Sequence, residues 1–146
     1  MKIILLGEDA IRLEPDTGPM TIEALSADQQ YSPFHMLASG LAYCIFSILH
    51  SWGETVKLGA DDLAVEVRWS FAEEPHRVGT MAVSLEWPSL PPARTAVAQR
   101  VATLCPIHAT LHHSPEIAIT RSGAEPAGAR EAATAPAHAA PGVESR

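Results

Sequence analysis

Two cysteines, Cys44 and Cys105, are the residues of this chain best suited to covalent chemistry, and they are its only cysteines. Each stands in a predicted helical setting beside small residues. A lone buried cysteine usually acts as a small hydrophobic residue. Two thiols in such settings raise a second possibility, a redox pair that cycles between two thiols and a disulfide.

The surroundings predicted for Cys44 do not favour a thiolate. Cys44 lies in the middle of an apolar helix, away from the helix N-terminus that would stabilise negative charge. Its neighbours on that helix are uncharged: Gly40, Leu41, Ser47 and Ile48. A cation from another segment could activate it, and Arg12 and His35 are the candidates. Without such a cation, Cys44 is an inert thiol of the core.

Cys105 has the more favourable local field. Pro106 follows it and suits the first position of a short helix, so Cys105 becomes the N-cap, where free backbone N–H groups favour a thiolate. The alternative is a weak cap in a helix–helix corner. Cys105, His108 and His112 also share one helix face, which with Cys44 could build a zinc site. Solvated histidines fit the same spacing, and we expect neither a metal nor another cofactor.

The elements that must position these residues follow from periodicity and turn signals. Strands are expected at residues 2–6, 10–14, 20–25, 63–71, 77–87 and 116–120. Helices are expected from a Ser32-Pro33 start to about Trp52, ending at Gly53, and at residues 93–104 and 107–113. The first helix is apolar around most of its circumference, which predicts a buried central helix. The sum is an α+β fold.

Composition limits the class of protein. The chain has 146 residues, a hydrophobic fraction of 47% and a net charge of −7. This size and composition suit one domain, expected at residues 1–123, and residues 124–146 read as a disordered tail rich in Ala and Pro. An acidic protein is a poor partner for nucleic acid. The four apolar residues near the N-terminus are too few for the core of a signal peptide, and the apolar run at residues 36–49 is too short for a bilayer, so we expect a soluble cytoplasmic protein without membrane contact.

Two motifs carry a family resemblance. Ser32-Pro33-Phe34-His35 leads through small residues to Ala42-Tyr43-Cys44, with eleven residues from the proline to the cysteine. A second helix then ends in Cys105-Pro106, followed by a short helix and the strand expected at residues 116–120. In this order the chain resembles the family of osmotically inducible protein C and organic hydroperoxide resistance proteins (OsmC/Ohr). The resemblance covers roughly residues 10–121.

The resemblance implies antiparallel sheets wrapped around a central helix, in an intertwined homodimer. Many family members are thiol peroxidases that reduce organic hydroperoxides and are reset by a dithiol reductant. By resemblance, Cys44 matches the peroxidatic cysteine and Cys105 the resolving cysteine. Phe34 and His35 fall where substrate would bind.

One departure bears directly on activity. Active family members hold a glutamate directly after the motif proline and an arginine on an N-terminal strand, which together poise the thiolate. Here Phe34 replaces the glutamate, and Arg12 is the only arginine ahead of the helix. The alternative is therefore a catalytically silent protein that binds a small apolar ligand in the dimer cleft. Trp52, Trp69 and Trp87 could line such a pocket or form the core of the hairpin.

Overall fold

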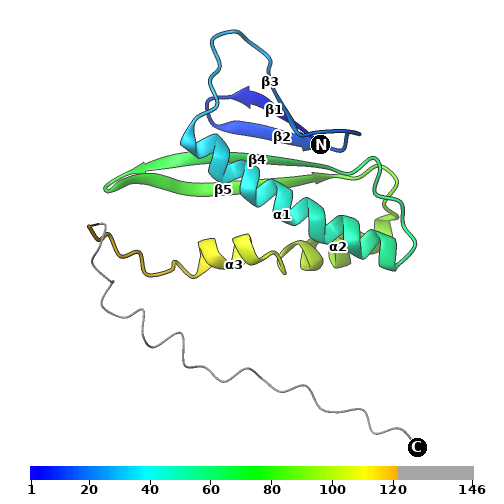
Figure 1. The fold of residues 1–146 in the computed structure, drawn as a ribbon. Helices are drawn as coiled ribbons and strands as arrows, with labels where there is room; N and C mark the ends of the chain where they lie inside the picture. Colours follow the sequence, from blue (N-terminus) through cyan, green and yellow to red (C-terminus); the bar gives the residue numbers. More distant parts are fainter. Residues whose placement is uncertain (122–146) are drawn as a thin grey trace, which may run out of the picture. The chain divides into compact units, whose positions relative to one another are not determined.

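A computed structural model describes residues 1–121 of the chain. Residues Met1–Ser114 form one structural unit, and a second unit begins at Pro115. The elements of the first unit, in order, are β1 (Lys2–Gly7), β2 (Ala10–Glu14), β3 (Thr21–Ala24), α1 (Pro33–Thr55), β4 (Ala64–Glu73), β5 (His76–Glu86), a short 3-10 helix (Pro92–Arg94), α2 (Thr95–Ala102) and α3 (Pro106–His112) (Figure 1).

The strands form one sheet in the order β3-β1-β2-β4-β5. Most neighbours are antiparallel, but β3 runs parallel to β1 because the chain passes from β2 to the far side of β1. The β4–β5 hairpin is the longest pairing, and it packs beneath α1 (Figure 1). The α+β class predicted from the sequence is confirmed, with a single mixed sheet in place of the expected antiparallel sheets.

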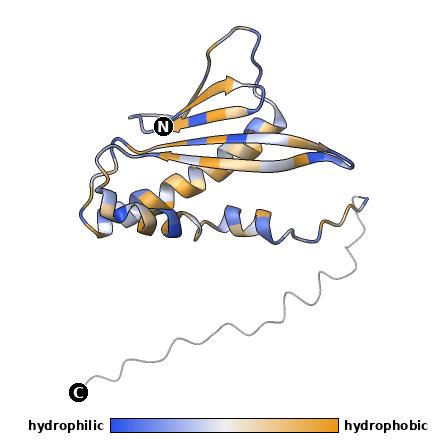
Figure 2. Ribbon diagram, turned by 180° about the vertical axis from the view of Figure 1, so that it is seen from behind, coloured by the Kyte–Doolittle hydropathy of each residue, from blue (hydrophilic) through white to orange (hydrophobic). Residues whose placement is uncertain are grey.

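Helix α1 lies on one face of the sheet and forms the core with it. Its start follows the local sequence: Ser32 is the N-cap and Pro33 occupies the first turn. Hydrophobic and hydrophilic residues alternate along the strands (Figure 2), and β1, β2 and β4 contribute the buried hydrophobic residues that pack with α1. The most deeply buried of these residues include Ile3, Ile11, Leu13, Leu49, Leu63, Val65 and Val67.

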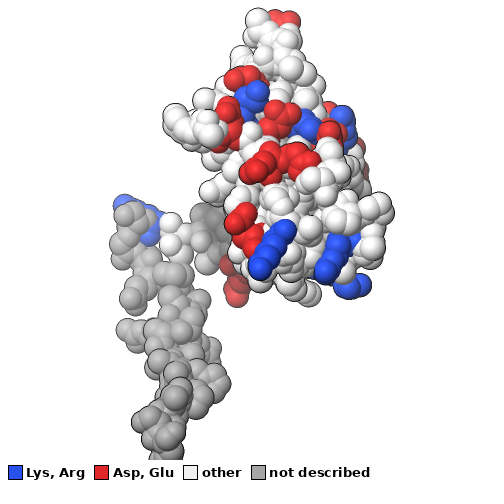
Figure 3. Space-filling model, turned by 90° about the vertical axis from the view of Figure 1, so that its right-hand side faces the viewer, with Lys and Arg blue, Asp and Glu red and all other residues white. Residues whose placement is uncertain are grey.

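The opposite face of the sheet carries charge. Ion pairs join Lys2 to Glu14 and Glu23, and Arg68 to Glu66. On the side of the molecule drawn in Figure 3, acidic side chains lie among the basic ones. Exposed pairs of this kind contribute little to stability, and they mark this face as solvated.

The sequence prediction placed the end of α1 at Gly53, and this was wrong. The helix continues to Thr55 because Gly53 is buried against Trp87, where an added Cβ would lie 3.3 Å from the indole ring. Gly53 is therefore a close-packing residue of the helix. The chain turns two residues past the helix, at Lys57, which adopts a positive φ of 59°. The Leu58 N–H donates to the Gly53 carbonyl at 2.8 Å, as in a helix-terminating turn.

The strand expected at residues 116–120 is absent from the part of the chain that the structure describes. Ile117 and Ile119 alternate as a half-buried strand would, yet they are 79% and 96% exposed. A strand exists only where a second strand satisfies its backbone N–H and C=O groups. Residues 115–121 have no such partner here, which the local pattern could not reveal. The predicted tail at residues 124–146 lies outside the described residues.

Helix α1 has the length and composition of a membrane-crossing helix. It has 23 residues, and its most apolar 18-residue window has a mean hydropathy of 1.3. However, 44% of that window is buried inside the protein. The central helix of a folded core meets the same criteria, and the packing of α1 on the sheet accounts for its apolar composition.

Candidate functional site

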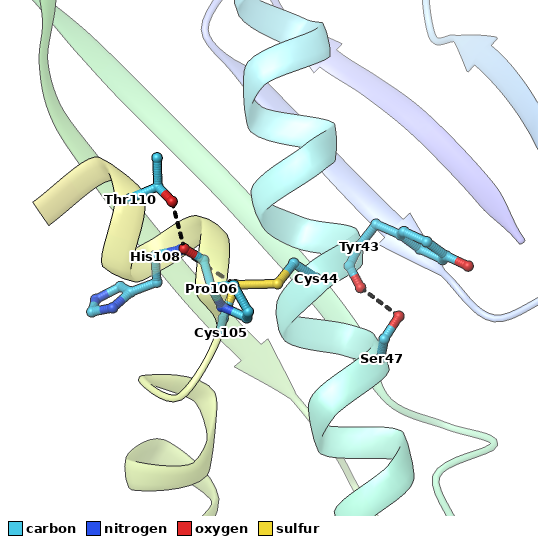
Figure 4. The surroundings of a disulfide bond; sticks show 7 residues. All are labelled: Tyr43, Cys44, Ser47, Cys105, Pro106, His108 and Thr110. Atoms are coloured by element: carbon cyan, nitrogen blue, oxygen red, sulfur yellow. Dashed lines mark hydrogen bonds between the residues drawn. A yellow bond between two sulfur atoms is a disulfide. The ribbon is translucent and has the colours of Figure 1, made fainter. Parts of the chain in front are cut away.

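Cys44 of α1 and Cys105 at the start of α3 form a disulfide (Figure 4). Their Cα atoms lie 5.9 Å apart, and 61 positions separate them along the chain. This Cα distance is typical of disulfides in folded proteins. The structure thus joins the two cysteines that the sequence singled out, across the corner between α1 and α3.

Cys105 is the N-cap of α3, as predicted from Pro106. It is completely buried, and its Sγ accepts a hydrogen bond from the backbone N–H of His108 at 3.3 Å. A hydrogen bond from an N-terminal amide stabilises negative charge on the atom that accepts it. The same sulfur therefore links α3 to α1 and caps α3.

Cys44 has a different environment. It is half-buried in the middle of α1, far from the N-terminus of its own helix. On the same helix, the Ser47 hydroxyl donates to the Tyr43 carbonyl at 2.8 Å (Figure 4). Cys44 is therefore the more accessible sulfur of the pair, and Cys105 is the one better prepared to carry charge.

Arg12 points away from this corner. Its neighbours on β2, Ile11 and Leu13, are fully buried under α1, so the alternation of the strand puts Arg12 on the charged face of the sheet. There it pairs with Glu14 at 2.8 Å and with Glu86 at 2.6 Å. The pKa of Arg12 is raised, chiefly by its hydrogen bond to Glu14 and also by Glu86. Within this chain, Arg12 is bound to two carboxylates rather than placed beside Cys44.

His35 is a buried anchor of the α1 N-terminus. Its Nδ1 accepts a hydrogen bond from the Ser32 backbone N–H at 3.1 Å, and its Nε2–H donates to the Gly7 carbonyl at 2.9 Å. The His35 backbone N–H also reaches the Ser32 hydroxyl, which completes a capping box. The sequence analysis missed this role, although histidine stands three residues after the N-cap serine, where glutamate or glutamine usually completes the box.

A groove of about 1380 Å³ runs between α1, β5, α2 and α3. The α1 wall is apolar and continuous, with residues on one stripe of the helix: Phe34, Leu37, Leu41 and Ile45. The helical wall opposite adds polar groups that the sequence analysis did not single out, including Gln99, Thr103 and Ser114. No local pattern marks them, because α1, β5, α2 and α3 must come together to make the groove.

Phe34 stands at one end of this groove. It also lines a smaller hollow of about 450 Å³, together with His35, Phe71 and Gly7. The rings of Phe34 and Phe71 meet edge to face, with centroids 4.8 Å apart. Phe34 is therefore well placed to contact a molecule in the groove, whereas both ring nitrogens of His35 already have partners.

The disulfide borders the groove without forming its lining. Leu41 and Ile45 flank Cys44 on α1, and Thr103 and His108 flank Cys105; all four line the groove. Trp87 also lines it, whereas Trp69 is a core residue that is 4% exposed. Of the two roles that the sequence allowed, Trp87 therefore lines the pocket and Trp69 belongs to the core.

The histidines of α3 do not assemble a metal site with the cysteines. The rings of His108 and His112 lie 4.5 Å apart, centroid to centroid, but the His108 ring is directed away from the disulfide (Figure 4). Cys105 is bonded to Cys44. Among residues 1–121, no three His, Cys, Asp or Glu side chains are grouped to hold a metal ion.

Comparisons with known proteins agree with this architecture. The sequence profile of OsmC-like proteins matches residues 26–120, which is more than half of the chain. A crystal structure of an osmotic stress induced and detoxification response protein from Psychrobacter arcticus shares the fold. It aligns with a TM-score of 0.52 and 17% identity over 74% of this chain and 84% of that one. No curated protein matches. The chain belongs to the family of OsmC-like proteins.

Proposed function

We propose that this OsmC-like protein is a cysteine-based thiol peroxidase that reduces organic hydroperoxides. The Cys44–Cys105 disulfide beside an apolar groove is the observation that carries the proposal. A thiol peroxidase with a resolving cysteine forms such a bond in each cycle. The groove supplies an apolar surface for the organic part of the substrate.

The proposed cycle has three steps. The Cys44 thiolate attacks the terminal oxygen of ROOH, the O–O bond breaks, and Cys44 becomes a sulfenic acid, while the alkoxide takes up the proton that the thiol had released and leaves as an alcohol. The Cys105 sulfur then attacks the Cys44 sulfur, which forms the disulfide and releases water. A dithiol reductant donates two electrons and two protons, which restores both thiols and leaves the reductant as a disulfide.

Accessibility supports Cys44 as the attacking residue. A hydroperoxide must reach the attacking sulfur from outside, and Cys44 is half-buried whereas Cys105 is completely buried. Cys105 need only reach the neighbouring sulfur. Because thiol–disulfide cycling of this kind is characteristic of reducing compartments, we propose the cytoplasm as its location.

We expect slow turnover. Phe34 cannot accept a hydrogen bond, and Arg12 is paired with Glu14 and Glu86 on the other face of the sheet. Neither position that the resemblance pointed to, Phe34 or Arg12, therefore provides the carboxylate and guanidinium pair that would poise the Cys44 thiolate. A thiolate without a nearby cation is scarce at neutral pH, and the rate falls with the thiolate fraction.

Binding of a small apolar ligand is the second candidate function. The observation in its favour is Phe34, which extends the apolar stripe of α1 to the end of the groove. In this case the disulfide is structural, and the groove holds a ligand without converting it.

We also propose that the protein works as a homodimer. Strand β5 is at the edge of the sheet and is eleven residues long, so its outer N–H and C=O groups are open to another strand. Ile117 and Ile119 expose most of their surface. A second copy could cover both features. Sedimentation velocity over a range of protein concentrations measures the state, and a monomer throughout would exclude the proposal.

Consumption of cumene hydroperoxide by the reduced full-length protein, with dithiothreitol as reductant, tests the peroxidase. We expect turnover in the wild type, none above background in Cys44→Ser, and a sulfenic acid on Cys44 in Cys105→Ser. The Phe34→Glu variant restores a carboxylate at the position of the family glutamate and should increase the rate.

Two outcomes would reject this assignment. Background consumption by the wild type would leave ligand binding as the function of the groove. Turnover that persists in Cys44→Ser and vanishes in Cys105→Ser would reverse the roles of the two cysteines.

A further inference from the structure

We propose that Arg77 supplies the guanidinium that stabilises the Cys44 thiolate, and that it does so from the partner subunit of the homodimer. This role deepens the proposed peroxidase and rests on it and on the proposed homodimer. Thiolate reactivity can be measured without a hydroperoxide, so failure of this role and failure of the peroxidase are distinguishable.

Arg77 is a cation beside the groove that no carboxylate engages. Among residues 1–121, it is the one Lys or Arg side chain that lines the groove. Arg12 and Arg68 pair with carboxylates on the opposite face of the sheet. No ion pair holds Arg77 within the described part of the chain, where its Nη1 donates to the Val78 carbonyl at 3.2 Å. Its charge is therefore available to an anion on the groove side of the sheet.

Arg77 lies at the end of the groove where α1 begins. It pairs with Ala72 in the β4–β5 ladder, next to the pair that Phe71 forms with Val78. The ring of Phe71 meets that of Phe34 edge to face, with centroids 4.8 Å apart. Figure 1 likewise shows the β4–β5 turn toward the start of α1. Arg77 and Phe34 therefore share one end of the groove.

This end of the groove is too far from Cys44 of the same chain. Phe34 and Cys44 are ten positions apart on α1, which corresponds to about 15 Å along an unbroken helix. The His108 ring, the nearest alternative, is directed away from the disulfide (Figure 4). One chain therefore cannot bring the start of its α1 to its own Cys44, whereas a second chain can.

A two-fold axis would supply that second chain. When two copies of α1 pack antiparallel about an axis midway between positions 34 and 44, the start of each helix lies beside the middle of the other. Gly40 is near this midpoint, and an added Cβ there would meet nothing within 4 Å. A glycine on such a face lets a second backbone approach closely. The same symmetry gives each Cys44 an Arg77 from the other chain.

The guanidinium would act on the attacking sulfur alone. A positive charge beside a thiol favours the thiolate and increases its fraction at neutral pH by about tenfold or more. The three proposed steps keep their balance of protons and electrons, because Arg77 stays charged throughout. Phe34 provides no carboxylate to orient the guanidinium, so slow turnover remains the expectation.

The rate at which iodoacetamide alkylates Cys44 at pH 7 measures this effect. All proteins carry Cys105→Ser, which leaves Cys44 as the sole thiol. We expect Arg77→Ala and Arg77→Gln to lower the rate about tenfold, and Arg77→Lys to retain much of it because the charge remains. The matched control is Arg100→Ala on α2, which removes a guanidinium that does not line the groove and should leave the rate unchanged. An unchanged rate in Arg77→Ala would overturn the proposal.

Heterodimers isolated with two different affinity tags show which subunit supplies the arginine. In the first, an Arg77→Ala chain pairs with a Cys44→Ser chain, and the single Cys44 should react as in the dimer with Arg77 intact. In the second, a chain with both residues intact pairs with one that carries Cys44→Ser and Arg77→Ala, and its Cys44 should react about tenfold more slowly.

The reverse pattern would show that Arg77 acts on Cys44 of its own chain, and would reject the partner's role. Equal rates in the two heterodimers would also reject it. So would failure to recover a dimer with both tags when both chains keep Arg77 and Cys44.

Discussion

The two sides of α1 are attached to the rest of the protein by different kinds of contact. Toward the sheet, fully buried side chains such as Leu49 and Val65 pack without polar groups. Toward α3, one covalent bond joins half-buried Cys44 to Cys105, and no residue of α3 is buried. The first attachment depends on the removal of apolar surface from water. The second depends on the redox state of two sulfur atoms, so the protein can loosen one side of its helix without unfolding the other.

Reduction of the disulfide should have the largest effect on stability. The bond closes a loop of 61 positions, for which the chain-entropy estimate is about 4 kcal/mol of lost stability. Urea unfolding of the wild type with and without dithiothreitol measures this difference. Cys105→Ala should match the reduced protein and show no response to the reductant. A change below about 1 kcal/mol would mean that α3 is held by packing, and would remove the contrast between the two sides.

Leu49→Ala tests the sheet side. Leu49 is fully buried in the core, so the variant should lose about 3 kcal/mol of unfolding free energy. Because Leu49 packs in the core and does not line the groove beside α3, the loss should be the same in the oxidised and the reduced protein. A loss that differs between the two states by more than about 0.5 kcal/mol would show that the two sides are coupled.

His35→Ala tests the polar anchor at the start of α1. It removes the capping-box acceptor and leaves the Gly7 carbonyl without its partner, for an expected cost of about 2 kcal/mol. His35→Gln is the matched variant, since glutamine can complete the box, and should cost less. Thermal unfolding of both variants measures the effect. Equal losses would assign the role of His35 to its contact with Gly7 alone.

Lys57→Gly should have the smallest effect, and it should be stabilising. Lys57 holds a positive φ of 59°, which a glycine adopts without steric cost, so the gain should be about 0.5–1 kcal/mol. Lys57→Ala keeps the strain and should show no gain. Urea midpoints compare the three proteins. A gain in unfolding free energy that appears only in the oxidised or only in the reduced protein would show that the sheet side of α1 depends on the disulfide.

Local sequence predicted much of the fold. Ser32 and Pro33 marked the start of α1, Pro106 made Cys105 an N-cap, and alternation outlined β4 and β5. These features depend on hydrogen bonds and periodicities within a few residues, which the sequence displays directly. The end of α1 was misplaced because Gly53 serves close packing against Trp87, a residue far along the chain.

The candidate site was predictable only in part. The two cysteines could be named from the sequence, and the resemblance implied their pairing, but their meeting across α1 and α3 required the fold. The direction of Arg12 also required it, because strand alternation assigns a face only once the position of α1 is known. Residues 116–120 show the same limit, because their hydrophobic residues alternate as in a strand. No strand forms there, since no second strand pairs with these residues in the described part of the chain.

By itself, the sequence determined where α1 and α3 begin, how the hydrophobic residues alternate along β4 and β5, and that two cysteines are present. The tertiary structure decided which sulfur is buried, what pairs with Arg12, and how four elements enclose the groove. The physical reason is range: caps, turns and periodicity act over a few residues, whereas burial, ion pairing and cavities depend on segments brought together from the whole chain.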